Sequence, residues 1–252
     1  MKKCKWLQQQ WCILVLILPA ACQVSCQSGL MGGAAIDQLI YTAGYSVENR
    51  PVECRVLGTG DDVTMILAAI HGNEQAGTPL CLRLIDYYRE HPEDLDGRRV
   101  VLLPRTNPDG VIRNQRHNAH GIDLNRNFDS SNRQNTEVYG MSGLSEPESQ
   151  VIAQVILDYQ PDRIITLHEP LNCIDYDGPY LELANYLAKY CDLPIKKLGT
   201  SPGSLGGYAG LDLGIPLITV EFPDGSSDLD ADTLWSKYGR LLRAAVAYPE
   251  GI

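Results

Sequence analysis

The 252-residue sequence lacks any apolar run that approaches the roughly 20 residues needed by a membrane-spanning helix. Its apolar stretch near the N-terminus, Cys12–Leu18, is far shorter. Basic residues are scarce too, because residues 27–252 hold 18 lysines and arginines against 31 aspartates and glutamates, a net charge of −13. We therefore expect no transmembrane helix in the mature protein. A chain this acidic is also unsuited to binding nucleic acid.

Cysteine pairs of the form Cys-x-x-Cys are missing as well, which argues against a zinc site built from thiolates. Four cysteines follow the N-terminal segment: Cys54, Cys81, Cys173 and Cys191. In an oxidising compartment they allow one or two disulfides, and their spacing does not decide the pairing. Cys173 follows His168 by five residues and is a candidate neighbour of the site, with a buried apolar cysteine as the favoured interpretation. The sequence has no internal repeat and no low-complexity tract, so nothing suggests more than one compact domain.

Residues 1–25 predict an export signal. Three lysines precede the apolar stretch Cys12–Leu18, and small residues come directly before Cys22. A buried N-terminal helix is the competing interpretation. Ala-Ala-Cys is also typical of a lipoprotein cleavage site, although Pro19 stands where a leucine is usual. We therefore expect an exported, periplasmic protein, either free or anchored to the membrane by a lipid on Cys22.

The remaining residues, 36–250, predict a single α/β domain in which apolar strands alternate with helical segments. The expected strands are Val63–Ile70, Val100–Leu103, Ile164–Leu167 and Leu217–Val220, and the expected helices are Gly77–Arg89, Glu146–Tyr159, Tyr180–Tyr190 and Asp232–Ala247. This alternation indicates a parallel or mixed sheet with helices on both faces. In such sheets the ligand binds beyond the carboxyl ends of the strands, so polar residues at those ends are the candidate site.

Three of these polar residues form a candidate metal site. His71 and Glu74 follow one expected strand, and His168 follows another. Two imidazoles and a carboxylate suit a hydrolytic zinc, which keeps its fourth position open for water. His117 and His120 are rivals for the third ligand, although their polar loop favours contact with solvent or substrate.

Glu221 ends a further apolar strand, where a carboxylate is costly to bury unless it is paired or functional. It is our candidate general base, taking a proton from water and passing it to the leaving amine. A capping or ion-paired glutamate is the alternative. Glu169 competes because it lies beside His168, but neighbouring strand residues point to opposite faces, so both are not expected to face the metal.

Four residues of a short polar stretch complete the candidate site. Asp123 can accept a hydrogen bond from the second ring nitrogen of a ligand histidine. Asn125 and Arg126 can clamp a carboxylate, and Arg116 can face the oxyanion that develops at the carbonyl. A surface ion pair is the competing interpretation for each arginine alone, but it is weaker for residues that cluster within so few positions.

Together these motifs resemble the zinc carboxypeptidase (M14) family. The matching pieces are His71-Gly-Asn-Glu74, Asn107-Pro-Asp-Gly110, Arg116, Gly121-Ile-Asp-Leu-Asn-Arg-Asn-Phe128, His168 and Glu221. The resemblance implies a mixed eight-stranded sheet between helices and one Zn²⁺ per chain. It further implies that the zinc ligands are His71, Glu74 and His168, with Glu221 as catalytic base. Arg116 would then polarise the scissile carbonyl, while Asn125 and Arg126 would bind the substrate's terminal carboxylate.

Within that family the sequence is similar to the murein peptide amidases. The supporting pieces are Ser145-Glu-Pro-Glu148, Leu167-His-Glu-Pro-Leu-Asn-Cys173, Ser201-Pro-Gly-Ser204 and Thr219-Val-Glu-Phe-Pro223. This similarity implies hydrolysis of the γ-D-glutamyl–meso-diaminopimelate bond in a murein peptide. Two features depart from it: the amidases lack an export signal, and the tyrosine that covers the substrate in digestive members has no clear counterpart, Tyr208 being a candidate of uncertain register.

Two other functions stay open at this point. His-Gly-Asn-Glu and Asp-Leu-Asn-Arg also resemble the aspartoacylase and succinylglutamate desuccinylase group, which cleaves N-acyl amino acids. Asn107-Pro-Asp-Gly110 and the Phe222-Pro223 pair after Glu221 favour the peptidases. A metal-free peptidoglycan-binding protein is the third hypothesis, and the complete set of ligands and base argues against it.

Overall fold

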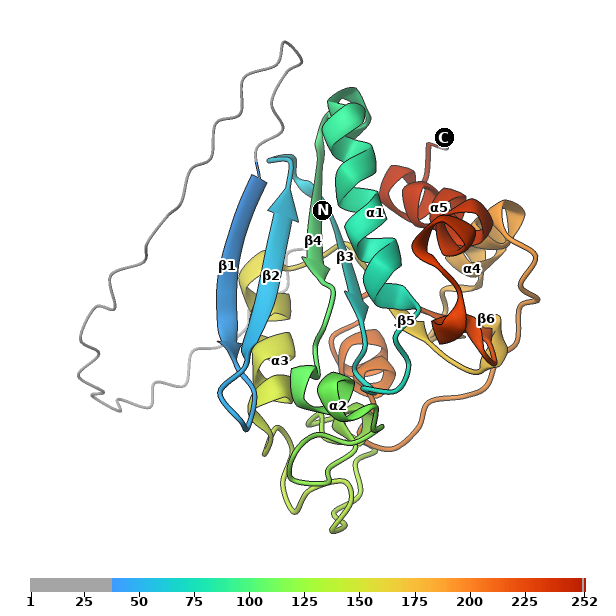
Figure 1. Ribbon diagram of the computed structural model, residues 1–252. Helices are drawn as coiled ribbons and strands as arrows, with labels where there is room; N and C mark the ends of the chain where they lie inside the picture. Colours follow the sequence, from blue (N-terminus) through green and yellow to red (C-terminus); the bar gives the residue numbers. More distant parts are fainter. Residues whose placement is uncertain (1–37, 251) are drawn as a thin grey trace. The chain divides into compact units, whose positions relative to one another are not determined.

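The computed structural model describes residues 38–250 and 252, and its centre is a mixed β-sheet (Figure 1). The described residues form seven strands in the order β1-β2-β4-β3-β5-β7-β6. Their bounds are β1 Gln38–Tyr45, β2 Pro51–Leu57, β3 Asp62–Ala68, β4 Arg98–Leu103, β5 Arg163–His168, β6 Leu171–Asp177 and β7 Leu217–Pro223. The mixed α/β sheet is confirmed, with seven strands in this part of the chain where the resemblance implied eight.

Four parallel strands, β4, β3, β5 and β7, occupy the middle of the sheet. The antiparallel strands lie outside them, with β1 and β2 at one edge and β6 at the other. All four strands expected from apolar runs are therefore the central, parallel ones. Such strands are buried on both faces and read as continuous apolar segments, whereas the outer strands mix polar and apolar residues.

Helices cover both faces of the sheet (Figure 1). One face packs against α1 (Gly77–Glu90), α4 (Leu181–Leu187) and α5 (Ala231–Ala247). The other packs against α3 (Pro147–Tyr159) and the π-helical turn Gly206–Asp212. The four helices expected from the sequence are all present, and the short α2 (Pro108–Arg113) is an addition. Each core forms where alternate strand residues meet the apolar stripe of a helix.

The α3 face of the sheet changes from apolar to polar along the strands. Residues Met65, Leu67, Ile164 and Leu217 of this face are buried in the core beneath α3. Towards the carboxyl ends of β5 and β7, the same face instead carries His168 and Glu221. The candidate site therefore begins where the apolar packing of this face ends, as expected for the carboxyl ends of parallel strands.

The four cysteines after the N-terminal segment are free thiols. Cys54, Cys81 and Cys173 are buried and Cys191 is partly exposed. The expected burial of Cys173 is therefore confirmed, and none of the four takes part in a disulfide. Within the described ranges, no helix has the length and apolar character to cross a membrane. The predicted export signal at residues 1–25 and the lipidation candidate Cys22 lie outside the described residues.

Candidate metal centre and active-site pocket

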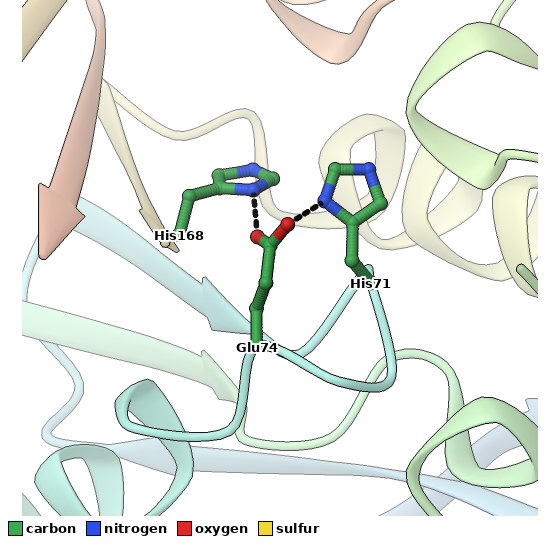
Figure 2. A group of neighbouring side chains, drawn as sticks. All are labelled: His71, Glu74 and His168. Carbon is green, nitrogen blue, oxygen red and sulfur yellow. Dashed lines mark hydrogen bonds and ion pairs between the residues drawn. The ribbon is translucent and has the colours of Figure 1, made fainter. Parts of the chain in front are cut away.

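Figure 2 shows the Glu74 carboxylate lying between two imidazole rings. Its Oε1 is 2.7 Å from Nδ1 of His71, and its Oε2 is 2.8 Å from Nδ1 of His168. One ligand atom from each of the three residues can be chosen so that all lie within 4.8 Å of one another. The structure thus brings together all three predicted metal-binding residues, although His168 is 94 positions from Glu74.

The turn after β3 aims His71 and Glu74 at the same point. Gly72 makes this turn possible, because a Cβ there would lie 2.0 Å from the backbone carbon of Gly110. Asn107 holds the two segments together: its Nδ2 donates to the carbonyl oxygen of Ile70, and its Oδ1 accepts from the amide of Gly110. The Asn-Pro-Asp-Gly stretch therefore supports the turn that carries the candidate metal ligands His71 and Glu74.

The three side chains are almost completely buried, with His71, Glu74 and His168 at most 6% exposed. Burial by itself would raise the pKa of Glu74, but hydrogen bonds with His168 and His71 outweigh it and bring that pKa well below its ordinary value. Burial likewise opposes protonation of His71, yet its contacts with Asp123 and Glu74 raise its pKa. The cluster therefore holds a carboxylate anion that attracts positive charge, as a cation site requires.

Asp123 and Arg116 form a second layer around the centre. Asp123 Oδ1 is 3.2 Å from Nε2 of His71, which is the ring nitrogen that faces away from Glu74. Arg116 donates from Nε to Asp123 at 3.0 Å and from Nη1 to Glu74 at 3.1 Å. Asp123 also accepts from the amide of Asn125, so the same carboxylate fixes both the histidine ring and the following turn. A carboxylate on the outer nitrogen is the usual way to orient a metal-binding imidazole.

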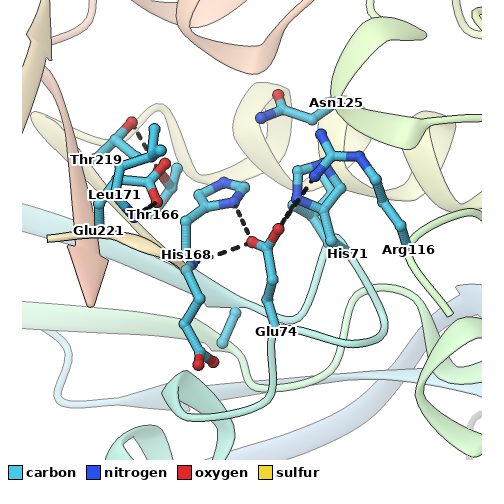
Figure 3. Close-up of polar contacts among 12 residues, drawn as sticks. His71, Glu74, Arg116, Asn125, Thr166, His168, Leu171, Thr219 and Glu221 are labelled. Atoms are coloured by element: carbon cyan, nitrogen blue, oxygen red, sulfur yellow. Dashed lines mark hydrogen bonds and ion pairs between the residues drawn. The ribbon is translucent and has the colours of Figure 1, made fainter. Parts of the chain in front are cut away.

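Glu221 lies opposite His168 on the neighbouring strand β7. Figure 3 shows Glu221 on one side of the histidine pair, with Arg116 and Asn125 on the other. The carboxylate is 8% exposed, accepts a hydrogen bond from the amide of Leu171 at 3.3 Å, and has its pKa raised by burial. A raised pKa moves a carboxylate towards the range in which it can accept a proton and later return it.

Glu169 also lines the pocket that contains these residues, but its carboxylate is bonded to neighbouring segments of the fold. Its carboxylate accepts from the amide of Ala76 at 3.1 Å and from the amide and hydroxyl of Ser227 at 3.0 and 2.6 Å. With its two oxygens engaged in these bonds, Glu169 links the start of α1 to the turn after β7. The expectation that Glu169 and His168 face opposite ways agrees with this arrangement.

One pocket joins these residues. It is lined by His71, Glu74, His168, Glu221, Arg116, Asn125 and Arg126, and so includes the predicted substrate-binding residues. Asn125 Oδ1 accepts from the amide of Leu205, and Arg126 donates from Nη1 to the Asn125 carbonyl oxygen. These bonds hold the Asn-Arg pair at the wall of the pocket, within the same cavity as the three candidate metal-binding side chains.

The rival histidines and Tyr208 lie outside this pocket. His120 is 58% exposed at its side chain and pairs with Glu146, while His117 does not line the cavity. Tyr208 stacks on Phe128 with ring centroids 5.8 Å apart and packs against the core beneath α3. Tyr208 therefore does not cover the pocket in this structure.

Several pocket residues escaped the sequence analysis, among them Asp175, Asp177 and Thr219. Thr219 lies inside an expected strand, where alternation with apolar residues already places it on the face of Glu221. Asp175 and Asp177 belong to β6, which was not expected because its sequence mixes polar and apolar residues. Their spacing of two was the available signal, since it puts both on one face of a strand.

This donor set fits zinc: two imidazole nitrogens and a carboxylate converge, and the outer nitrogen of one imidazole contacts a carboxylate. A buried set of three candidate ligands beside an open pocket, with a further carboxylate and an arginine, is the arrangement that a zinc-dependent hydrolase requires. The comparison with known families agrees, because the Zinc carboxypeptidase family model matches residues 37–180. The chain belongs to the zinc carboxypeptidase family and is an enzyme of that class.

Individual relatives extend the match beyond those residues. The chain is 34% identical over 197 residues to murein peptide amidase A of Escherichia coli strain K12, covering 71% of this chain and 78% of that protein. The crystal structure of a murein-tripeptide amidase from Escherichia coli O157 superposes with a TM-score of 0.65 and 28% identity, covering 84% of this chain and 93% of the other. Bovine thrombin-activatable fibrinolysis inhibitor shares the fold, with a TM-score of 0.71 at 19% identity over 85% of this chain and 88% of its own.

Replacement of His168 by alanine is expected to abolish zinc binding, because it removes one of three donors and leaves the Glu74 carboxylate with one imidazole partner. Zinc per chain, measured by atomic emission after dialysis, should fall from about one to near zero, since a structured site depends on its full ligand set. His91→Ala, at a partly exposed histidine between α1 and the next turn, is the matched control and should keep the metal. Full zinc occupancy in His168→Ala would exclude this residue as a ligand.

Proposed function

We propose that this enzyme is a zinc-dependent amidase that hydrolyses the γ-D-glutamyl–meso-diaminopimelate bond of murein peptides. The observation that carries the proposal is a pocket lined by the cluster of His71, Glu74 and His168. The same pocket is also lined by Glu221, Arg116 and Arg126. The similarity to amidases named for murein peptides, over most of the length of both chains, supports the substrate class.

In this proposal one zinc ion per chain is held by His71, Glu74 and His168. When bound, the metal would act as a Lewis acid on the carbonyl. It would also lower the pKa of water, so that a nucleophile is available at neutral pH. Asp123 keeps the His71 ring oriented through its outer nitrogen. The contact between Asp123 and His71 thus keeps the ligand geometry fixed while the reaction proceeds.

Glu221 is the proposed general base and acid. Its carboxylate accepts a proton from the attacking water while the water oxygen bonds to the γ-carbonyl carbon of D-glutamate. It then passes that proton to the amine nitrogen of diaminopimelate as the carbon–nitrogen bond breaks. Its position opposite His168 and its raised pKa suit both steps.

Arg116, Asn125 and Arg126 are proposed to handle the negative charges of the substrate. Arg116 already donates to two buried carboxylates and keeps a partly exposed guanidinium at the pocket, where it can face the oxyanion. Asn125 and Arg126 would bind the carboxylate next to the scissile bond, because a planar guanidinium grips a carboxylate in bidentate fashion. The N-acyl amino acid deacylase hypothesis is not retained, because the family match favours the peptidases.

We also propose that the enzyme works in the periplasm, on the basis of the signal-like sequence at residues 1–25. Cleavage before Cys22 with lipidation would hold it at the membrane, and ordinary cleavage would release it. The intact mass of the protein isolated from cells of its source should therefore lack the first 21 or more residues, with an added diacylglyceryl group only in the anchored form. A mass equal to the full 252 residues would exclude export by this signal.

Glu221→Gln is expected to keep zinc and lose at least about 1,000-fold in kcat, because glutamine preserves the shape of the side chain but cannot accept the proton. Zinc content and turnover of the same preparation check the two halves of this prediction. A variant that turned over near the wild-type rate would show that another group is the base. Loss of zinc together with activity would instead show that Glu221 supports the metal.

The substrate assignment is tested by incubating L-Ala-γ-D-Glu-meso-diaminopimelate with the mature protein, with and without a zinc chelator. Mass spectrometry should show release of free diaminopimelate that stops when the chelator removes the metal. A tripeptide that stays intact in the presence of zinc-loaded enzyme would exclude this bond as the substrate, and ordinary C-terminal peptides would then be examined with the same assay.

A further inference from the structure

A short loop, residues 117–122, joins Arg116 to Asp123 and contributes no residue to the active-site pocket. The loop contains no helix or strand. At its start the Arg116 carbonyl oxygen accepts from the amide of Gly72 at 3.3 Å, and at its end the amide of Asp123 donates to the carbonyl oxygen of Val138 at 2.8 Å. Because two residues of the site flank this loop, their positions depend on what holds the loop between them.

Asn118 closes the loop on itself. Its Oδ1 accepts from the amides of His120 and Ile122 at 3.1 and 3.0 Å, and its backbone amide donates to the carbonyl oxygen of Ile122 at 3.0 Å. The residue is only 3% exposed. The side-chain oxygen of Asn118 therefore fixes the shape of the loop, and its side-chain nitrogen is left to bind another segment.

That nitrogen reaches two carboxylates at the start of α3. Asn118 Nδ2 donates to Oε2 of Glu146 at 2.8 Å and to Oε2 of Glu148 at 3.1 Å. Nδ1 of His120 lies 2.7 Å from the same Glu146 oxygen, although the His120 side chain is 58% exposed. Among the described residues, every hydrogen bond that joins residues 117–122 to the rest of the chain ends at one of these two glutamates. Asn118 is thus the buried link between the loop and α3.

Glu148 is completely buried, and within the described ranges no lysine or arginine pairs with it. Its Oε1 accepts from the amide of Val47 at 3.1 Å, and its Oε2 accepts from Asn118. Burial raises the pKa of Glu148, whereas the hydrogen bond from Asn118 lowers it. An acid in the first turn stabilises a helix even when it is exposed. Helix stability alone therefore does not account for a buried glutamate paired with a buried asparagine.

We propose that Asn118 is a positioning residue of the active site: by tying the loop to the two glutamates, it sets where Arg116 and Asp123 lie. Arg116 donates to Glu74 and Asp123, but its side chain remains 38% exposed at the pocket, so few other contacts fix it (Figure 3). Asp123 in turn contacts the outer nitrogen of His71. The effect on turnover rests on the proposed amidase function, in which Arg116 faces the oxyanion, whereas the effect on zinc does not.

The test reverses the direction of one hydrogen bond. Asn118→Asp removes the donor and leaves three carboxylates facing one another. Glu148→Gln alone also breaks the arrangement, because the single amide oxygen of the new side chain can accept from Val47 or from Asn118 but not from both. In the double variant Asn118→Asp/Glu148→Gln, the new amide donates to the new carboxylate while its oxygen still accepts from Val47. The number of carboxylates then returns to two.

Zinc-loaded Asn118→Asp is expected to lose about 10- to 100-fold in kcat on L-Ala-γ-D-Glu-meso-diaminopimelate, with KM within about threefold, because a displaced Arg116 weakens only the transition state. Zinc affinity, measured by competition with a chelator, should fall about 10-fold because Asp123 holds His71 less firmly. The double variant should recover most of both losses. Asn185→Asp, at an exposed asparagine of α4, is the matched control and should change neither quantity.

Three results would overturn the inference. Wild-type kcat and zinc affinity in Asn118→Asp would show that the loop needs no such link. A lower melting temperature with both quantities unchanged would assign Asn118 to stability alone. A double variant no better than Asn118→Asp would show that Glu148 is not the partner that matters. If Asn118→Asp does not fold, Glu148→Gln takes its place in the comparison, since it breaks the same bond from the other side.

The zinc measurement separates this inference from the amidase proposal. If the wild type does not cleave the tripeptide, the amidase proposal fails, and zinc affinities of the wild type, the two single variants and the double variant still test the link. Weaker binding in both single variants that the double variant reverses supports the positioning role. Equal affinities in all four proteins overturn it.

Discussion

The interaction on which the rest of the site depends is the contact of the Glu74 carboxylate with the imidazoles of His71 and His168. All three groups are buried, and a carboxylate is stable there only while hydrogen bonds and positive charge offset its lost hydration. Arg116 and Asp123 extend the same balance outward, since the guanidinium bridges both carboxylates and Asp123 contacts the outer nitrogen of His71. A metal cation at this point would complete the charge balance.

The sheet converts this local chemistry into an active site. Parallel strands end at one edge, so His168 and Glu221 become neighbours through strand pairing, although 53 residues separate them in sequence. Neighbouring residues at a strand end point in opposite directions, and so Glu169 has a different role from His168. The Glu169 carboxylate ties the start of α1 to the turn after β7. The same alternation runs on to Thr219 and Asp175, and the floor of the pocket is therefore a continuous polar strip of one sheet face.

Much of the fold could be predicted because the central strands are buried on both faces and therefore read as unbroken apolar runs. The outer strands could not, since β1 and β6 alternate or mix polar residues and resemble loops at the level of sequence. The site followed the same division. The recognisable strands end at four of the site residues, namely His71, Glu74, His168 and Glu221. The two aspartates of β6 belong to a strand that the sequence pattern does not predict.

By itself, the sequence determined which chemical groups are available: two histidines, a candidate metal-binding glutamate and a candidate base after expected strands, and an Asn-Arg pair in a polar stretch. Only the tertiary structure decided which of the rival histidines joins the cluster, that the Glu169 carboxylate binds Ser227, and that Asp175 and Asp177 share a pocket with the three clustered side chains. The physical reason is that side-chain type and local periodicity are properties of the sequence and can be read from it directly. Burial, charge pairing and the close approach at Gly72 arise only when distant segments pack together.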